Sequence, residues 1–164
     1  MRRSRKALRY YPLAVKVAER LILVVGGGEV AERKVATLGD CKAKIRVISP
    51  MATDMLKDLA GRGRIEWIQR QVRSSDARGA YLIIAATDDK VVNERISRWA
   101  RKNKIWINVV DNAALSDFIS PAIFRAGEGI IAVYTDGRDP VLSRDLKNFL
   151  KERWDDFLSY RDRL

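Results

Sequence analysis

Histidine is absent from this chain of 164 residues, and cysteine occurs once, at Cys41. Without histidine there can be no Ser-His-Asp or Cys-His catalysis, no HExxH zinc site and no imidazole general base. A single cysteine excludes a disulfide framework and a thiolate metal cluster. Any proton transfer must therefore be carried out by Asp, Glu, Lys, Tyr or water, and we predict no metal site.

Acidic residues are in the minority, with 21 Asp and Glu against 32 Lys and Arg, which gives a formal net charge of +11. Such a surface favours anionic partners, among them nucleic acid, anionic lipid and ligands rich in phosphate or carboxylate. Long apolar runs are also missing. The apolar stretch after the basic residues 1–9 is too short for a signal peptide, and no run approaches transmembrane length. We therefore expect a soluble cytoplasmic protein that makes no contact with membranes.

A glycine-rich motif is the most informative stretch that is present. Three glycines, Gly26–Gly28, follow the apolar run Leu21–Val25 and precede helix-forming residues, which is the order of a buried strand, a phosphate-binding turn and a helix N-terminus. In this G-x-G-x-x-A pattern, Gly26 permits the tight turn, Gly28 lets backbone approach a pyrophosphate, and Ala31 allows close packing of helix on strand. The alternative is a glycine-rich turn without a ligand.

Strands and helices alternate over the first two thirds of the chain. The predicted strands are 21–25, 44–48, 65–68, 81–86 and 105–110, and the predicted helices are 30–38, 53–60 and 91–102. This alternation predicts an α/β fold, with a Rossmann-like, doubly wound and mostly parallel sheet in an NAD-binding domain of residues 1–112.

The pattern changes after this domain. Residues 118–124 and 129–134 are typical of paired strands, in a small α+β region that we assign to 113–142 and to dimerisation. Residues 141–164 are predicted to form one long helix with an apolar stripe, and the part from 143 on is treated as a third, C-terminal helical segment. We expect this stripe to pack on a partner subunit or on further residues.

Ligands of open α/β sheets bind outside the carboxyl ends of the strands. Four such ends outline one crevice, and their candidate cofactor-binding residues are Gly26, Gly28, Ser49, Pro50, Thr87 and Asn108. The second strand end lacks the acidic residue that marks NAD, and Arg46, the nearest base for a 2′-phosphate, lies inside the strand. The residues alone leave NAD and NADP open.

A carboxylate, Asp111, follows the strand predicted over 105–110 and stands just past Asn108, where the nicotinamide half of a dinucleotide should reach. In a chain without histidine, Asp111 is the prime candidate for a proton acceptor, and Asp117 is a weaker one. The alternative is that Asp111 only makes an Asx-turn before Asn112. Position alone leaves both interpretations open.

A polar loop over 135–140 precedes the last predicted helix. Thr135 and Arg138 are candidates for substrate binding, because the loop offers the hydroxyl of Thr135, the cation of Arg138 and backbone N–H groups. The alternative is a solvated turn in which Asp139 caps the helix and Pro140 occupies its first position. The pattern does not decide between them.

Several motifs occur together, in order, over about residues 11–150. They are Gly26–Lys34, Ala85–Asp89 with Asn93, Asn108–Asp111, Phe118–Ile119 with Pro121, and Pro140–Arg144. This set resembles the precorrin-2 dehydrogenase family, the dehydrogenase and ferrochelatase part of siroheme synthases.

The resemblance implies an oxidoreductase that converts precorrin-2 to sirohydrochlorin with NAD⁺, in siroheme and therefore porphyrin biosynthesis, and it implies a homodimer. It gives Asp111 the role of essential acid or base. It also implies contacts to NAD from Glu29, Val30, Pro50 and Met51, and it puts Thr135 where some members carry a phosphorylatable serine. A polycarboxylate substrate suits a basic crevice.

Some members of this family also insert Fe²⁺. Members usually continue beyond the position of Leu164 with a further helical domain, so the resemblance leaves chelation open. A different kind of function is a nucleotide-sensing Rossmann module without turnover, and a third is a chelatase with a vestigial nucleotide pocket, which the intact glycine motif argues against. The chain shows no helix-turn-helix and no aromatic RNA platform, so no nucleic-acid partner is expected.

Overall fold

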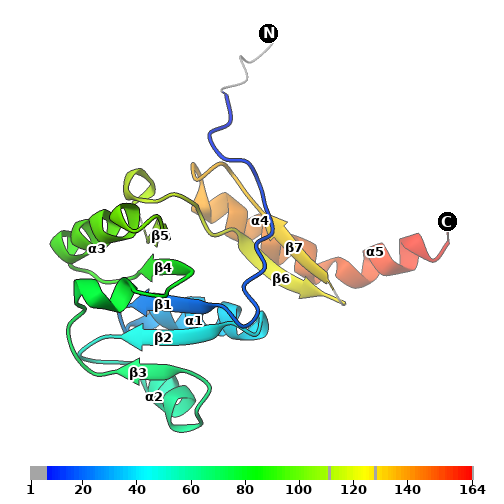
Figure 1. The fold of residues 1–164 in the computed structure, drawn as a ribbon. Helices are drawn as coiled ribbons and strands as arrows, with labels where there is room; N and C mark the ends of the chain where they lie inside the picture. Colours follow the sequence, from blue (N-terminus) through cyan, green and yellow to red (C-terminus); the bar gives the residue numbers. More distant parts are fainter. Residues whose placement is uncertain (1–6, 111, 128, 164) are drawn as a thin grey trace. The chain divides into compact units, whose positions relative to one another are not determined.

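The computed structural model describes residues 7–110, 112–127 and 129–163 (Figure 1). The chain divides into two compact units, each described here by itself. We call residues 15–118 the sheet unit, and residues 1–14 together with 119–164 the hairpin unit. Asp111, the predicted catalytic residue, lies outside the described residues.

The sheet unit is built on five strands in the order β3-β2-β1-β4-β5, and every pairing between neighbours is parallel. The strands are β1 (Leu21–Val25), β2 (Lys44–Ile48), β3 (Glu66–Ile68), β4 (Leu82–Ala85) and β5 (Trp106–Val109). The chain builds outward from β1 to β3 and then crosses back to place β4 on the other side of β1. The predicted Rossmann-like fold is therefore confirmed, and the order of strands reverses between β1 and β4.

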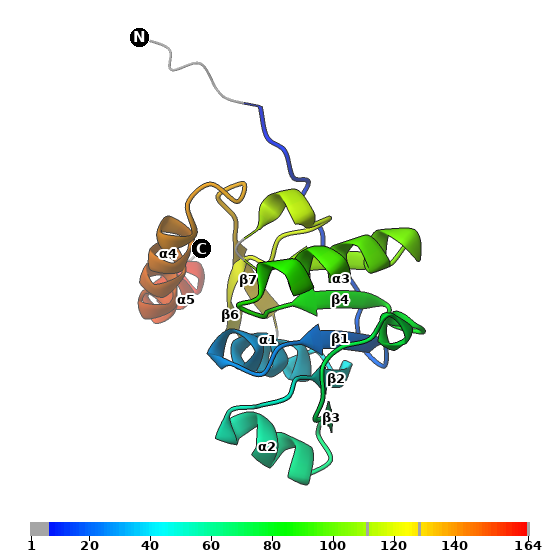
Figure 2. The same cartoon turned by 90° about the vertical axis from the view of Figure 1, so that its left-hand side faces the viewer.

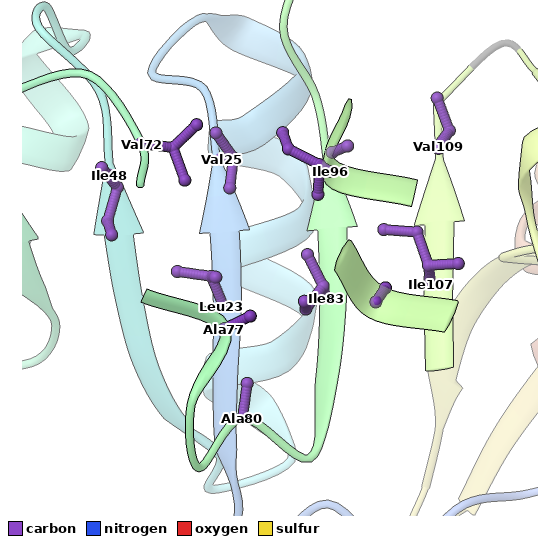
Figure 3. Packing of buried hydrophobic residues seen from close by; sticks show 12 residues of the cluster. Leu23, Val25, Ile48, Val72, Ala77, Ala80, Ile83, Ile96, Ile107 and Val109 are labelled. Carbon is purple, nitrogen blue, oxygen red and sulfur yellow. The ribbon is translucent and has the colours of Figure 1, made fainter. Parts of the chain in front are cut away.

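Helices cover both faces of this sheet (Figure 2). They are α1 (Glu29–Asp40), α2 (Asp54–Gly61) and α3 (Lys90–Lys102), with the short 3₁₀ helices η1 (Ser74–Ala77) and η2 (Ala113–Leu115). Alternate residues of each strand enter opposite cores. Leu23 and Val25 pack beneath α3 (Figure 3), whereas Ile22 and Val24 pack against α1 and α2. Burial on both faces explains why the central strands β1 and β4 are continuously apolar.

The glycine motif makes the turn from β1 into α1 and lies against backbone on two sides. Gly26 has φ +120°, and a Cβ there would be 2.2 Å from the carbonyl oxygen of Ala86. A Cβ on Gly27 would be 1.9 Å from the carbonyl oxygen of Met51. Gly27 also accepts a hydrogen bond from the Thr53 N–H at 2.9 Å. The loop therefore has no room for a side chain at either position.

The hairpin unit contains the antiparallel strands β6 (Ala122–Ala126) and β7 (Gly129–Val133), followed by α4 (Pro140–Glu152) and α5 (Trp154–Arg161). The prediction of one helix over 141–164 is wrong, because Arg153 leaves helical geometry with φ −100° and ψ 13° and ends α4. Beyond this break, the Trp154 ring packs edge-on against Phe124 of β6, with 6.0 Å between centroids. Apolar spacing does not reveal such a break, because the stripe continues through it.

Substitution of Gly27 by alanine should destabilise the protein. The new methyl group would overlap the Met51 carbonyl, so the free energy of unfolding should fall by about 1–3 kcal/mol or more. Gly28→Ala is the matched control, since a Cβ at Gly28 meets no atom within 4 Å, and its effect should stay within about 1 kcal/mol. Urea unfolding of both variants measures the difference, and equal stabilities would show that the loop tolerates the methyl group.

Candidate nucleotide-binding site

A cleft of about 730 Å³ opens in the sheet unit at the carboxyl ends of β1, β2 and β4. Its volume lies in the range of small-molecule sites, and it lies where the strand order reverses, the usual ligand position in such sheets. Eight of the nine predicted cofactor-binding residues line it: Gly26, Gly28, Glu29, Val30, Ser49, Pro50, Met51 and Thr87.

The N-terminus of α1 forms the middle of the cleft. Gly28 caps the helix with extended backbone, at φ −85° and ψ −176°, and none of the described side chains accepts a hydrogen bond from the first turn. The first N–H groups of a helix lack intrahelical partners and carry partial positive charge. Space is open beside Gly28, where an added Cβ would meet no atom within 4 Å. A phosphate or pyrophosphate fits this arrangement.

The end of β2 supplies a second wall from residues 49–53. The Ser49 carbonyl accepts a hydrogen bond from the Trp67 indole N–H at 3.1 Å, which fixes the strand end, and Met51 is 81% exposed at the rim. No carboxylate occurs in this wall. Arg46 is held by Glu66, with 2.6 Å between Nε and Oε2, so it is engaged away from any 2′-phosphate.

The end of β4 forms the third wall, and Thr87 and Asn93 fix its shape. Thr87 Oγ1 donates to Asn93 Oδ1 at 2.8 Å, while Asn93 Nδ2 donates back to the Thr87 carbonyl at 2.8 Å. Asn93 is buried. Asp89 caps α3 by accepting from the N–H groups of Val91 and Val92 at 2.9 and 3.0 Å. This loop is therefore held in one conformation against α3.

The end of β5 differs from the other three. Asn108 is buried and is not among the residues that line the cleft; its Nδ2 donates to the Phe118 carbonyl at 3.0 Å. Asp117 accepts from the Ile107 N–H at 3.2 Å, which ties its carboxylate to the edge of β5. The side chain of Asn112 accepts a hydrogen bond from the Leu115 N–H at 3.3 Å.

The two predicted substrate-binding residues lie in the hairpin unit, where the Arg138 guanidinium already has partners. Arg138 is 2.9 Å from Asp136 and donates to the Ala7 carbonyl at 2.7 Å. Asp136, at φ 58°, also accepts from the N–H groups of Arg9 and Tyr10, and these bonds, Arg9 first, lower the pKa of its carboxyl despite its burial. The loop thereby holds the N-terminal segment.

The hydroxyl of Thr135 is engaged as well. Its Oγ1 lies 2.7 Å from Ser143 Oγ and 2.7 Å from the Asp139 carbonyl oxygen. Asp139 caps α4 by accepting from the Leu142 N–H at 2.8 Å, and Pro140 is in the first turn, as in the alternative interpretation of this loop.

Four of the other residues that line the cleft lie outside the strand ends and the loops directly after them that the sequence singled out: Gln71, Val72, Val92 and Arg95. Gln71 and Val72 follow β3, whose carboxyl end is not among the four strand ends that are predicted to outline the crevice. Val92 and Arg95 lie three residues apart on α3, the spacing that puts side chains on one helix face. That spacing was the available signal.

A salt bridge fixes the segment that carries Gln71 and Val72. Both terminal nitrogens of Arg70 bind Asp76, at 2.8 and 2.7 Å, and Asp76 also accepts from the Arg73 N–H at 2.7 Å. The hydrogen bond from Arg70 is the main cause that lowers the pKa of the Asp76 carboxyl. The Asp76 side chain is only 9% exposed, so the pair is shielded more than a surface ion pair.

Replacement of Asp76 by asparagine should remove an acid-sensitive part of the stability. Because the folded-state pKa lies below the usual value of about 3.9, the ionised carboxylate stabilises the fold above that pH, and the contribution is lost as the pH falls through the lowered pKa. Asp76→Asn should lower the free energy of unfolding by about 1–2 kcal/mol at pH 7, and the two proteins should converge only as the pH falls through the lowered pKa of Asp76.

The control for this experiment is Asp58→Asn, whose Arg62 partner is exposed, and which should change stability by less than about 0.5 kcal/mol. Urea unfolding across pH measures both. A constant gap between the wild-type and Asp76→Asn curves down to low pH would contradict the role given to this carboxylate.

Two kinds of feature are absent from the described part of the chain. No group of three or more Cys, Asp or Glu side chains there is arranged to hold a metal ion. None of the described helices has both the length and the apolar character needed to cross a membrane.

Comparisons with known proteins agree with the geometry of the cleft. The chain is 43% identical over 138 residues to the siroheme synthase of Methylococcus capsulatus, a match that covers 84% of this chain and 29% of that protein. It is 44% identical over 137 residues to the siroheme synthase of Ectopseudomonas mendocina, with the same coverage of 84% and 29%. The chain thus spans less than a third of the length of these relatives.

A solved structure, of SirC, a precorrin-2 dehydrogenase, is also similar, with a TM-score of 0.76, 26% sequence identity, and coverage of 88% of this chain and 71% of that chain. These similarities confirm the resemblance inferred from the motifs. Residues 13–122, more than half of the chain, match the model of a family described as "Putative NAD(P)-binding". With the Rossmann-like sheet, the glycine loop and the cleft, this match shows that the chain belongs to that NAD(P)-binding family.

Proposed function

We propose that this chain oxidises precorrin-2 to sirohydrochlorin with NAD⁺ as the hydride acceptor, a step of siroheme and therefore of porphyrin biosynthesis. The cleft carries this proposal, because an uncapped α1 N-terminus opens into it at the point where the strand order reverses. The similarity to a precorrin-2 dehydrogenase over 88% of this chain supports the choice of substrate.

The residues of the cleft would hold the dinucleotide and exclude water from it. N–H groups of the first turn of α1 bind the pyrophosphate. Glu29 and Val30 lie beside it on α1, and Pro50 and Met51 lie on the β2 wall. Thr87, fixed by Asn93, shapes the wall toward β4. When bound, NAD⁺ supplies an acceptor for the hydride that leaves the macrocycle.

Asp111 is proposed as the acid or base of the reaction. Oxidation of the macrocycle releases a hydride and a proton, and the proton needs an acceptor that this chain, lacking histidine, must supply from another side chain. In the sequence, Asp111 comes shortly after β5, the strand that pairs with β4 in the sheet. It is also close in sequence to Asn108, the ninth residue proposed for the cofactor site.

The charge of the chain supports a polycarboxylate substrate, since its formal net charge is +11. We propose Thr135 and Arg138 as substrate contacts, and their side chains would need little rearrangement to bind the substrate. The Arg138 side chain remains 38% exposed while Asp136 holds it in place, so it can present its remaining N–H groups to a carboxylate.

A homodimer is the proposed assembly, built on the 113–142 region and the C-terminal helices. Leu142, Leu146 and Phe149 of α4 follow one another at helical spacing and are 53%, 41% and 57% exposed. A stripe of this kind is costly to leave in water and is typical of a subunit interface. The cytoplasm remains the expected location.

The Asp111→Asn variant tests the proposed chemistry. Under anaerobic conditions, with precorrin-2 and NAD⁺, the wild-type chain should form NADH and sirohydrochlorin, followed by absorbance. The variant should bind NAD⁺ with unchanged affinity but turn over about 10²–10⁴-fold more slowly, because the proton acceptor is gone.

Asp117→Asn is the matched control, since its carboxylate is tied to the β5 edge, and it should retain activity. Full activity of Asp111→Asn would overturn the role of that residue. Binding of NAD⁺ by the wild-type chain without any oxidation would favour the nucleotide-sensing module instead.

The Phe149→Arg variant tests the assembly. A cation in the middle of the apolar stripe should prevent close packing of two copies, so light scattering should report a dimer for the wild-type chain and a monomer for the variant. Asn148→Arg adds the same charge at an exposed neighbouring position and should leave the dimer intact. A wild-type monomer at micromolar concentration would overturn the proposed dimer.

A further inference from the structure

Arg95 on α3 is the single cation among the described residues that line the cleft, and three carboxylates, Glu29, Asp88 and Asp89, line it as well. Glu29 stands in the first turn of α1, where its charge opposes a phosphate. The backbone N–H groups of α1 are therefore the donors for the phosphates of a dinucleotide. Arg95 is the one described cation at the cleft that is left to bind another part of the ligand.

The guanidinium of Arg95 has no polar partner among the residues that the structure describes. It lies over the Trp99 ring, with 5.2 Å from Cζ to the ring centroid. Its Nε is buried and has no hydrogen-bond partner, and no ion pair to Arg95 occurs among the described residues. Burial of an unpaired guanidinium N–H is costly, so a partner that arrives with a ligand would relieve this cost.

The surroundings of Arg95 suit a flat aromatic base. Val72 and Val92 line the cleft with it and present apolar surface. Figure 3 shows Val72 beside Val25 near the carboxyl end of β1, in the core that α3 covers. Gln71, next along the same segment, is exposed at the cleft and adds an amide. Apolar walls with a few convergent polar groups are the usual composition of a ligand pocket.

We propose that Arg95 determines specificity at the adenosine end of the dinucleotide. Its guanidinium donates hydrogen bonds to ring nitrogens of the adenine, and Val72 and Val92 pack against the base. This inference rests on the nucleotide binding of the proposed function, and not on the oxidation of precorrin-2.

Calorimetric titration of the whole chain with NAD⁺, with 5′-AMP and with inorganic pyrophosphate tests the proposal. Arg95→Met keeps an unbranched side chain and removes the donors. It should weaken NAD⁺ and 5′-AMP by about tenfold or more, as expected for the loss of hydrogen bonds from a charged donor. Pyrophosphate, which has charge but no base, should bind the variant as it binds the wild-type chain.

Two matched variants separate the base contact from charge and from folding. Arg98→Met removes an exposed arginine of the same helix that does not line the cleft, and it should bind all three ligands like the wild-type chain. Arg95→Lys keeps the charge but loses the planar fork of donors, and it should not restore binding of 5′-AMP.

Four results would overturn the inference. Unchanged binding of 5′-AMP by Arg95→Met would remove Arg95 from the base site, and a loss for pyrophosphate as large as that for 5′-AMP would assign Arg95 to the phosphates. Full recovery in Arg95→Lys would show that charge alone matters. Failure of the wild-type chain to bind NAD⁺ would overturn the proposed function together with this inference. The other results would overturn the inference alone and leave the proposed function standing.

Discussion

The cleft depends on backbone-to-backbone contact at the glycine loop. At Gly26 and Gly27 the chain lies so close to the carbonyls of Ala86 and Met51 that no Cβ fits. These contacts bring the loops after β2 and β4 to either side of the start of α1. The position of the first N–H groups of α1, and hence of any bound phosphate, follows from this close packing and not from a side-chain ligand.

Because both faces of the sheet are buried, the groups that can bind a ligand lie at the ends of the strands. The strand residues alternate between two cores, as Leu23 and Ile22 do, so within the described sheet unit the strands have little polar surface of their own. Polar groups gather where the strands stop, and hydrogen bonds such as that between Thr87 and Asn93 then hold these ends rigid. Rigid walls around open space are what a dinucleotide site requires.

The sequence predicts this architecture well where local pattern and tertiary packing agree. The strand 44–48 follows from its alternating apolar residues, and the turn at Gly26 follows from glycine chemistry. The requirement for glycine at position 27 could not be predicted, because it arises from a contact with Met51, which lies on a different strand end. The cleft position of Arg95 likewise depends on how α3 lies over the sheet, and the helix break at Arg153 has no signal in the apolar spacing. The candidate catalytic residue, Asp111, stays a prediction.

The buried carboxylate of Asp136 joins two segments from opposite ends of the chain, since it binds the N–H groups of Arg9 and Tyr10 across 127 and 126 positions of sequence. The hairpin unit is therefore discontinuous, with the sheet unit inserted between its two parts. During synthesis on the ribosome, residues 15–118 are complete long before Asp136 emerges. The sheet unit has all its own strands by then, whereas the N-terminal segment must wait for the last third of the chain to provide its acceptor.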